Sequence, residues 1–294
     1  MAALSRRFQN LIVSSPYIGA KWLGPVDLMT QLFCDDASTT IGDRSEPAAP
    51  DAGGQKKRLQ QEMEEATAAL KMEKMRIPST PIFRFQATDS PDLCCVDIFP
   101  LSDRNVVVAD HTGRAFHCDA GTRRVVGMPN LHEGKLDPIS VFSVFVPSAD
   151  ADDHRRGSLY VMERVPRPEK GGGAQLSDQF KALVCTGRAS EPPCWHSRLL
   201  PAPPFVYDPA ARYTYSRIKS YAVVGSDMIC ISTECNGTYC LDTASNAWDQ
   251  VGKWKLPFYG KAEYVPELKL WFGLSAEVGH LVALDLSGMD HGFK

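Results

Sequence analysis

The feature that most constrains this chain is a series of short apolar, β-branched and aromatic runs that begins after Leu93 and continues almost to the last residue. Turn residues separate the runs at intervals of about 8–12 residues, which is typical of β-sandwiches, barrels and propellers. The sequence therefore predicts an all-β fold. The predicted strands are 106–108, 115–119, 124–128, 140–146, 158–165, 180–185, 196–200, 221–224, 228–233, 238–241, 247–251, 261–265, 269–272 and 280–284.

Internal repetition selects the propeller among these folds. An apolar strand leads into an aspartate and a small polar turn at Asp119, Asp242 and Asp285. The separation of the last two is close to the ~40–50 residues of a propeller blade. An Asp carboxylate can close such a turn by accepting backbone N–H groups two or three residues on. Val125 and Trp248 then enter the next strand at the same register, which predicts that Trp248 is buried and structural.

The segment 242–248, Asp-Thr-Ala-Ser-Asn-Ala-Trp, resembles the kelch signature of an aromatic–Asp pair followed by Thr-Asn and Trp. Ser232-Thr233 and Ala109-Asp110 stand where kelch blades have a double glycine, so the blades are degenerate. The chain also resembles F-box-associated propellers of plants and the grass-expanded families of unknown function related to them, in segments 10–13, 99–104, 158–164 and 264–274. The resemblance implies a degenerate kelch-like β-propeller that serves binding, and it carries over no catalytic residue.

We predict three parts: 1–33, 34–76 and 77–294. The first holds strands 10–13 and 21–28 of a closing blade whose remaining strand should come from the C-terminus. The second is a flexible loop, 34–55, and one inserted helix, 56–75, which either packs on its own domain, stays solvated or offers a short coiled-coil site. The third holds about four blades, is incomplete at its C-terminal end, and should leave an unpaired strand edge at the seam.

No motif of catalysis or cofactor binding stands out: the sequence has no Gly-x-Ser-x-Gly, P-loop, Gly-x-Gly-x-x-Gly or His-Glu-x-x-His. We expect no enzyme activity, no cofactor and no metal site. Cys230, Cys235 and Cys240 lack the Cys-x₂₋₄-Cys pairing of metal sites and are interpreted as buried thiols of strands joined by an Asn236-Gly237 hairpin turn.

The remaining histidine and aspartate candidates are interpreted as surface residues. His111 and His117 flank a turn at Gly113 and are interpreted as surface histidines. Asp150, Asp152, Asp153 and His154 lack the glycine and terminal glutamate of a calcium loop and are interpreted as a solvated acidic loop.

Charge and targeting signals limit the partners. The net charge of −3 without a long basic run argues against nucleic acid, and no apolar stretch is long enough for a membrane span. No F-box segment for docking to a ubiquitin ligase is found. The nine cysteines, without a secretory signal, indicate reduced thiols in cytoplasm or nucleus. The acid-poor stretch before Asp27 leaves a plastid or mitochondrion as the alternative.

The sequence thus favours a non-enzymatic protein-interaction module with an unknown partner. One alternative is a propeller-type enzyme that acts on a sugar or small molecule, which needs acidic or histidine side chains from three or more blades on one rim. The other is a truncated, inactive family member.

Overall fold

The computed structural model describes residues 8–15, 20–27, 81–86, 96–143, 155–169, 176–187, 193–208, 217–225, 227–277 and 279–287. The predicted loop 34–55, the predicted helix 56–75 and the acidic loop around Asp152 lie outside these residues. Sheet β1–β2–β3 belongs for the most part to one compact unit, and all later elements belong to a second.

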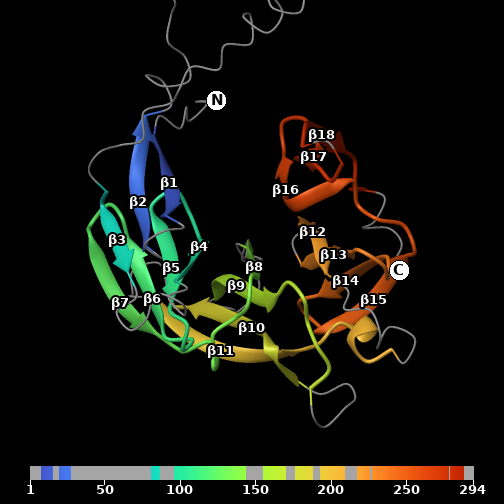
Figure 1. Ribbon diagram of the computed structural model, residues 1–294, viewed down its shortest axis with the longest axis horizontal. Coiled ribbons are helices and arrows are strands. Elements are labelled where there is room, and N and C mark those ends of the chain that lie inside the picture. The colour runs from blue at the N-terminus through green and yellow to red at the C-terminus, as the bar shows by residue number, and fades with distance from the viewer. Residues whose placement is uncertain are drawn as a thin grey trace, which may run out of the picture. The chain divides into compact units, whose positions relative to one another are not determined.

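The first unit is built on a three-stranded sheet of order β1–β2–β3 (Figure 1). Its strands are β1 (Phe8–Ser15), β2 (Ala20–Asp27) and β3 (Phe83–Gln86). The first two were predicted as strands. β3, the short alternating run Phe-Arg-Phe-Gln just after Pro81, was not predicted. The C-terminal strand that was expected to complete this blade stays a prediction, because 288–294 lie outside the described residues.

The second unit contains three four-stranded antiparallel meanders in which each strand pairs with the next along the chain (Figure 1). The first has β4 (Asp97–Pro100), β5 (Asn105–Ala109), β6 (Ala115–Asp119) and β7 (Arg124–Met128). The second has β8 (Pro138–Ser143), β9 (Arg155–Glu163), β10 (Leu176–Thr186) and β11 (Cys194–Pro201). The third has β12 (Ile218–Val224), β13 (Met228–Thr233), β14 (Thr238–Asp242) and β15 (Ala247–Gly252). A 3₁₀ turn, η1 (Pro204–Val206), connects the second and third.

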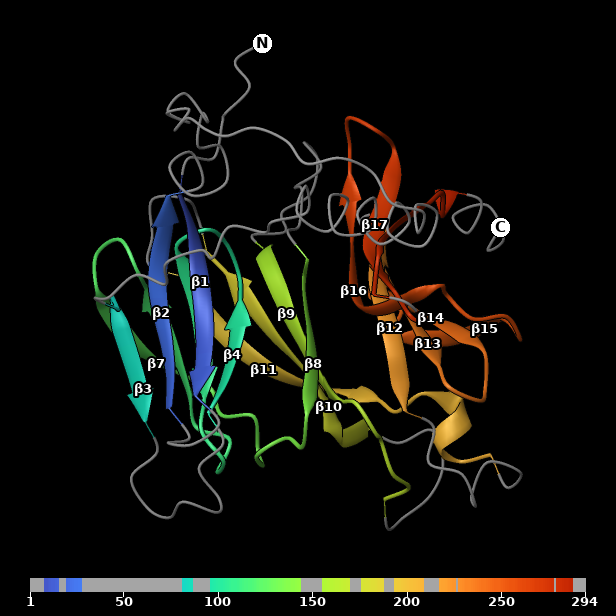
Figure 2. The ribbon, with the colours of Figure 1, turned by 45° about the horizontal axis from the view of Figure 1, so that its top comes forward.

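The last described strands form another antiparallel meander, β16 (Phe258–Val265), β17 (Leu270–Ser275) and β18 (Leu281–Leu284). Here β16 runs parallel to β12, with Ser220 opposite Gly260 and Ala222 opposite Ala262, so the two meanders join into one seven-stranded sheet (Figure 2). This parallel pairing was not predicted. It brings the first strands of two successive meanders side by side.

Three apolar clusters lie between successive meanders and hold them together. One cluster joins β4–β7 to β8–β11 and includes Val107, Leu159 and Leu183. The next joins β8–β11 to β12–β15 through residues such as Phe180 and Ile231. The third packs β12–β15 against β16–β18. A fully buried aliphatic or aromatic side chain contributes about 1.5–3 kcal/mol, so these interfaces are the main source of stability.

Repeated antiparallel meanders that pack face to face in chain order define a degenerate β-propeller. The prediction of an all-β fold with about four blades and an incomplete one is confirmed at this level. Within the described residues, three meanders have four strands and two have three. The incomplete meanders are those formed by the first and the last described strands.

The predicted Asp turns are confirmed. Asp119 Oδ1 accepts the N–H of Gly121 at 2.8 Å, and Asp242 Oδ1 accepts the N–H of Ala244 at 2.8 Å. Each aspartate also receives a hydroxyl, from Thr122 and Ser245, at 2.9 Å. Asp285 accepts the N–H two residues on, from Ser287, at 2.9 Å. The repeated Asp turns are therefore closed by the same kind of hydrogen bond, from a backbone N–H to the Asp carboxylate.

The Asp turns should make the protein sensitive to acid. Partial burial alone would raise the pKa of Asp119 and Asp242, but the hydrogen bonds from their own turns outweigh it and lower both pKa values. A lowered pKa stabilises the fold above the unfolded value of about 3.9 and loses that contribution as pH falls through the folded value. Replacing both by Asn should therefore reduce the drop in unfolding free energy between pH 5 and pH 2 in urea titrations. The same change at the exposed Asp249 is the control, and equal drops would contradict the explanation.

Trp248 has a structural role, as predicted, but its ring is partly rather than fully buried. The indole N–H donates to the carbonyl oxygen of Pro201 at 2.9 Å, and the ring lies 5.8 Å from that of Phe180 at a tilt of 44°. Trp248 thereby fastens β15 to the preceding meander. Its counterpart at the same register, Val125, is half exposed, so the two repeats bury this position to different extents.

Candidate functional site

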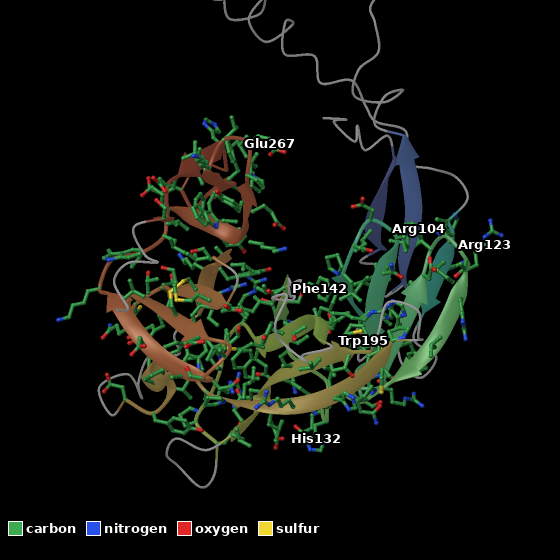
Figure 3. The ribbon with its side chains drawn as sticks, turned by 180° about the vertical axis from the view of Figure 1, so that it is seen from behind. Arg104, Arg123, His132, Phe142, Trp195 and Glu267 are labelled. Atoms are coloured by element: carbon green, nitrogen blue, oxygen red, sulfur yellow. A yellow bond between two sulfur atoms is a disulfide. The ribbon has the colours of Figure 1, made fainter. Side chains whose placement is uncertain are left out.

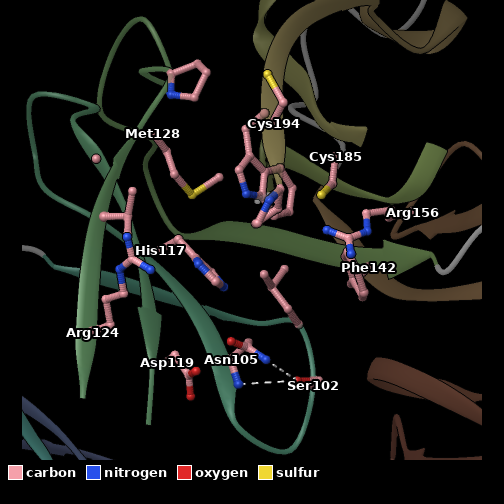
Figure 4. A pocket seen from close by; sticks show the side chains of 16 residues that line it. Ser102, Asn105, His117, Asp119, Arg124, Met128, Phe142, Arg156, Cys185 and Cys194 are labelled. Atoms are coloured by element: carbon pink, nitrogen blue, oxygen red, sulfur yellow. Dashed lines mark hydrogen bonds between the residues drawn. The ribbon is translucent and has the colours of Figure 1, made fainter. Parts of the chain in front are cut away.

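A cavity of about 640 Å³ opens between the meander β4–β7 and the meander β8–β11 (Figure 4). Volumes of about 300–1,000 Å³ are usual for binding sites. The cavity is lined from β5 through β11, so it follows the interface between two successive meanders. The lining residues are Leu101, Ser102, Asn105, His117, Asp119, Arg124, Val126, Gly127, Met128, Pro129, Phe142, Arg156, Cys185, Pro193, Cys194 and Trp195.

The apolar part of the lining continues the protein core. Leu101, Met128, Phe142 and Trp195 pack against the cluster of buried residues between the two meanders, and each also lines the cavity. Figure 3 shows Phe142 and Trp195 between the two sheets. The cavity therefore lies where side chains leave this interface unfilled. Its apolar floor packs against the buried core.

The polar part of the lining comes from one face of β6 and its neighbours. His117 lies opposite Val126, and Asp119 lies opposite Arg124 on β7 and Asn105 on β5. Because side chains alternate along a strand, these paired residues share a face. The intervening Cys118 is directed to the other face and is fully buried.

Trp195 and His117 meet across the cavity, with ring centroids 6.1 Å apart at a tilt of 45°. Burial lowers the pKa of His117, against an opposing effect of Asp119, and therefore favours the neutral form of the ring. The indole Nε1 of Trp195 is buried and has no acceptor among the described residues. A buried donor without an acceptor is costly, which makes this N–H a candidate contact for a ligand.

Positively charged side chains outnumber negatively charged ones in the lining of the cavity. Asp119 is used by its own turn and lies 3.9 Å from Arg104. Two arginines, Arg124 on β7 and Arg156 on β9, stand on opposite walls (Figure 4). Among the described residues, none forms a hydrogen bond or ion pair with the side chain of Arg124.

Two buried or half-buried thiols near the cavity, Cys118 and Cys185, are poor nucleophiles. Burial raises the pKa of Cys185, although Arg156 opposes it, and burial raises the pKa of Cys118 to about 11. The thiolate is the reactive form of cysteine, so both side chains stay protonated at neutral pH.

Two buried lysines hold one wall of the cavity in place. The ammonium of Lys135 donates to the carbonyl oxygens of Leu131, Glu133 and Asp178 at 3.2, 3.2 and 2.6 Å. Lys181 on β10 donates to the carbonyl oxygen of Asn130 at 3.1 Å. These bonds fasten the segment after β7 to β10, and thus connect the two meanders that border the cavity.

A second polar group surrounds Asp137, which precedes β8. Its Oδ2 lies 2.9 Å from Nε of Arg164 and 3.1 Å from Nη2 of Arg217. The contact with Arg217 is a hydrogen bond, whereas the one with Arg164 is an ion pair without hydrogen-bond alignment. Asp137 is therefore committed to two arginines.

Two interpretations from the sequence need correction. His117 is not a surface histidine: it lies half-buried in the middle of β6 and lines the cavity, whereas His111 is exposed as expected. Cys230 and Cys240 are buried, but they form a disulfide rather than free thiols. The hairpin around Gly237 sets them directly opposite each other on β13 and β14, with Cα atoms 4.1 Å apart. Cys235 is free and exposed.

Among the described residues, no group of three or more His, Cys, Asp or Glu side chains could hold a metal ion. In the same part of the chain, no helix is long and apolar enough to cross a membrane.

The fold and the cavity define a class, the all-β proteins of degenerate propeller type. Within it, the family model DUF1668, described as a protein of unknown function, matches residues 6–294, and the chain belongs to this family. No curated protein matches the chain.

Two solved structures are similar at low identity. The β-propeller domain of Myceliophteria thermophila Cps50 (Swd1) is 12% identical, with 88% of this chain and 63% of that chain covered and a TM-score of 0.35. A structural genomics protein of unknown function from Bacteroides thetaiotaomicron VPI-5482 is 9% identical, with 65% and 40% covered and a TM-score of 0.35. The chain spans less than two thirds of the length of either.

Proposed function

We propose that this chain is a non-enzymatic interaction module that binds a segment of a partner protein in the cavity between β4–β7 and β8–β11. The observation that carries the proposal is the composition of the lining: an apolar floor packed on the core, bordered by polar and charged side chains from four strands, β5, β6, β7 and β9. Such a combination gives both affinity and orientation to a bound group. The shared Asp turns support our assignment of the blades to the kelch-like type.

The enzyme alternative receives less support from the same residues. A glycoside or acyl-transfer mechanism needs an acid and a base, or a nucleophile and a base, that can exchange protons with a substrate. Asp119 is saturated by its turn, Asp137 is paired with two arginines, and the Cys185 thiol stays protonated. The His117 ring contacts Trp195, but no described residue forms a side-chain hydrogen bond with it, so it has neither an activated nucleophile nor an orienting carboxylate.

Neighbouring residues on β7 give a matched test. Val126 lines the cavity, whereas Val125 is half exposed on the opposite face of the same strand. A photo-crosslinking phenylalanine analogue at position 126 should form adducts with a partner, and the same analogue at 125 should not. The adduct is identified by mass spectrometry, and the purified partner is then titrated against the chain.

In that titration, Val126→Trp should weaken binding by about tenfold or more, because the indole fills the cavity, and a tenfold loss corresponds to 1.4 kcal/mol. Val125→Trp should change the Kd by less than about twofold. Equal binding by both variants would refute the proposed site. Turnover of a small-molecule substrate that Val126→Trp abolishes would favour the enzyme alternative instead.

A further inference from the structure

The cavity offers donors and cations but no available acid. Among the described residues that line it, Asp119 is the one carboxylate, and its oxygens accept the backbone N–H and side-chain hydroxyl of its own turn. Arg124 and Arg156 face each other across the opening (Figure 4). A ligand that enters therefore meets two cationic side chains and one carboxylate, and the side chain of Arg124 has no partner among the described residues.

A second, independent observation also points to an acceptor on the ligand. The indole N–H of Trp195 is buried at the edge of the apolar floor, and no described residue accepts its hydrogen bond. Buried polar groups in folded proteins are nearly always paired. An acceptor group that is bound in the cavity would satisfy this donor, as would an ordered water molecule in its place.

The border of the cavity suits an extended chain. Among the described strands, β7 is the last strand of its sheet and β11 is the last strand of the next. Both line the cavity, through Val126 and Met128 on one side and Trp195 on the other. Strand edges of this kind can add a peptide through main-chain hydrogen bonds while pockets take alternate side chains.

We infer that the cavity recognises a short acidic peptide segment of the partner, in which an Asp or Glu stands beside a bulky apolar residue. The carboxylate is read by the guanidinium of Arg124, where bidentate hydrogen bonding is possible, and the apolar side chain lies on the floor formed by Met128 and Phe142. This inference rests on the proposed function and gives it a ligand class.

The test uses the indole signal of Trp195 in ¹⁵N–¹H spectra of the whole chain, which has five tryptophans. Trp195→Phe identifies the signal by its loss. The probes are pools of acetylated, amidated pentapeptides with Asp or Glu at the centre and Leu, Met, Phe or Trp beside it. Matched pools carry Asn or Gln, or Lys, at the centre. The acidic pool should shift the Trp195 signal with an affinity about tenfold or more above both matched pools.

Arg124→Gln should remove most of that preference for the acidic pool, again about tenfold. The matched control is Arg123→Gln, because Arg123 is the preceding residue, does not line the cavity and lies at the outer side of the sheet (Figure 3). The affinity of the Arg123→Gln variant for the acidic pool should stay within about twofold of that of the unchanged chain.

The outcomes separate the two proposals. If peptides shift the Trp195 signal but acidic and amide pools bind equally, or if Arg124→Gln behaves like Arg123→Gln, the inference is overturned and the binding function survives. If the crosslinker at position 126 captures a segment without an acidic residue, the inference is likewise overturned. If neither the pools nor the crosslinking experiment shows binding, both proposals fall.

Discussion

Replacing Trp248 by alanine is expected to lower the free energy of unfolding by about 3–5 kcal/mol, the usual cost of removing a large packed aromatic side chain. The ring packs against the core shared by β8–β11 and β12–β15, and it contacts Phe180. The substitution also removes the hydrogen bond to the Pro201 carbonyl oxygen. Both losses weaken the same interface between meanders.

The chain supplies a matched control for this prediction. Trp254 is 45% exposed, and Trp254→Ala should cost less than about 1 kcal/mol. Trp248→Phe keeps most of the ring but loses the N–H donor, so it should fall between the two. Urea unfolding monitored by circular dichroism measures all three. If Trp248→Ala and Trp254→Ala had equal unfolding midpoints, the ring of Trp248 would not be part of the core.

Local pattern was sufficient for most strands of the second unit. Strands β6, β7 and β13 begin and end where the sequence predicted. The Gly113 and Asp119 turns delimit β6 and the start of β7, and turns at Gly225 and Gly237 flank β13. The strand–turn–strand corners predicted at Asp119 and Asp242 are also confirmed, with Asp119 opposite Arg124 and Asp242 opposite Ala247. These are local properties, set by turn chemistry and by alternation within a few residues.

The missed strands are short and their turn signals are weak. β3 and β4 have four residues each, and β4 ends at a proline, which the search for β-branched runs passes over. These two segments are strands because they form hydrogen bonds with neighbouring strands, β3 with β2 and β4 with β5. Tertiary context of this kind cannot be read from a four-residue window.

The cavity was not predicted, because its residues come from seven strands that only the packing of two meanders brings together. His117 illustrates the reason. Its position near the Gly113 turn suggested a surface residue, whereas its register opposite Val126 directs it into the cavity. One feature of the sequence does indicate the site. His117, Asp119 and Arg124 are polar residues on one face of β6 and β7, and that face would be apolar if it only packed against the core.

The cysteine pair shows how the register of a hairpin can correct a spacing argument. Spacing alone excluded a metal site and left free thiols as the interpretation. The Asn236-Gly237 turn is confirmed, with Gly237 at a left-handed φ of 84°, and the hairpin around it sets Ser232 opposite Thr238. Continuing that register by two residues brings Cys230 opposite Cys240 on the same face.

Breaking the Cys230–Cys240 disulfide is expected to lower the free energy of unfolding by about 2–3 kcal/mol, because the closed loop is short and loop-closure entropy grows with length. The sulfur atoms lie in the core between β12–β15 and β16–β18, so the loss should be felt at that interface. Cys230→Ala combined with Cys240→Ala should show this deficit under oxidising conditions, whereas Cys235→Ser, at an exposed free thiol, should not.

Reductant provides the decisive comparison. The unchanged chain should lose stability when a strong thiol reductant is added, down to the level of the double alanine variant, while that variant should not respond. Without reductant, the peptide that contains residues 230 and 240 should resist alkylation after denaturation, and its mass should rise by about two hydrogens on reduction. Alkylation of both cysteines without reductant would show that the pair is a dithiol. In that case the stability of this hairpin would come from packing alone, as the sequence had first suggested.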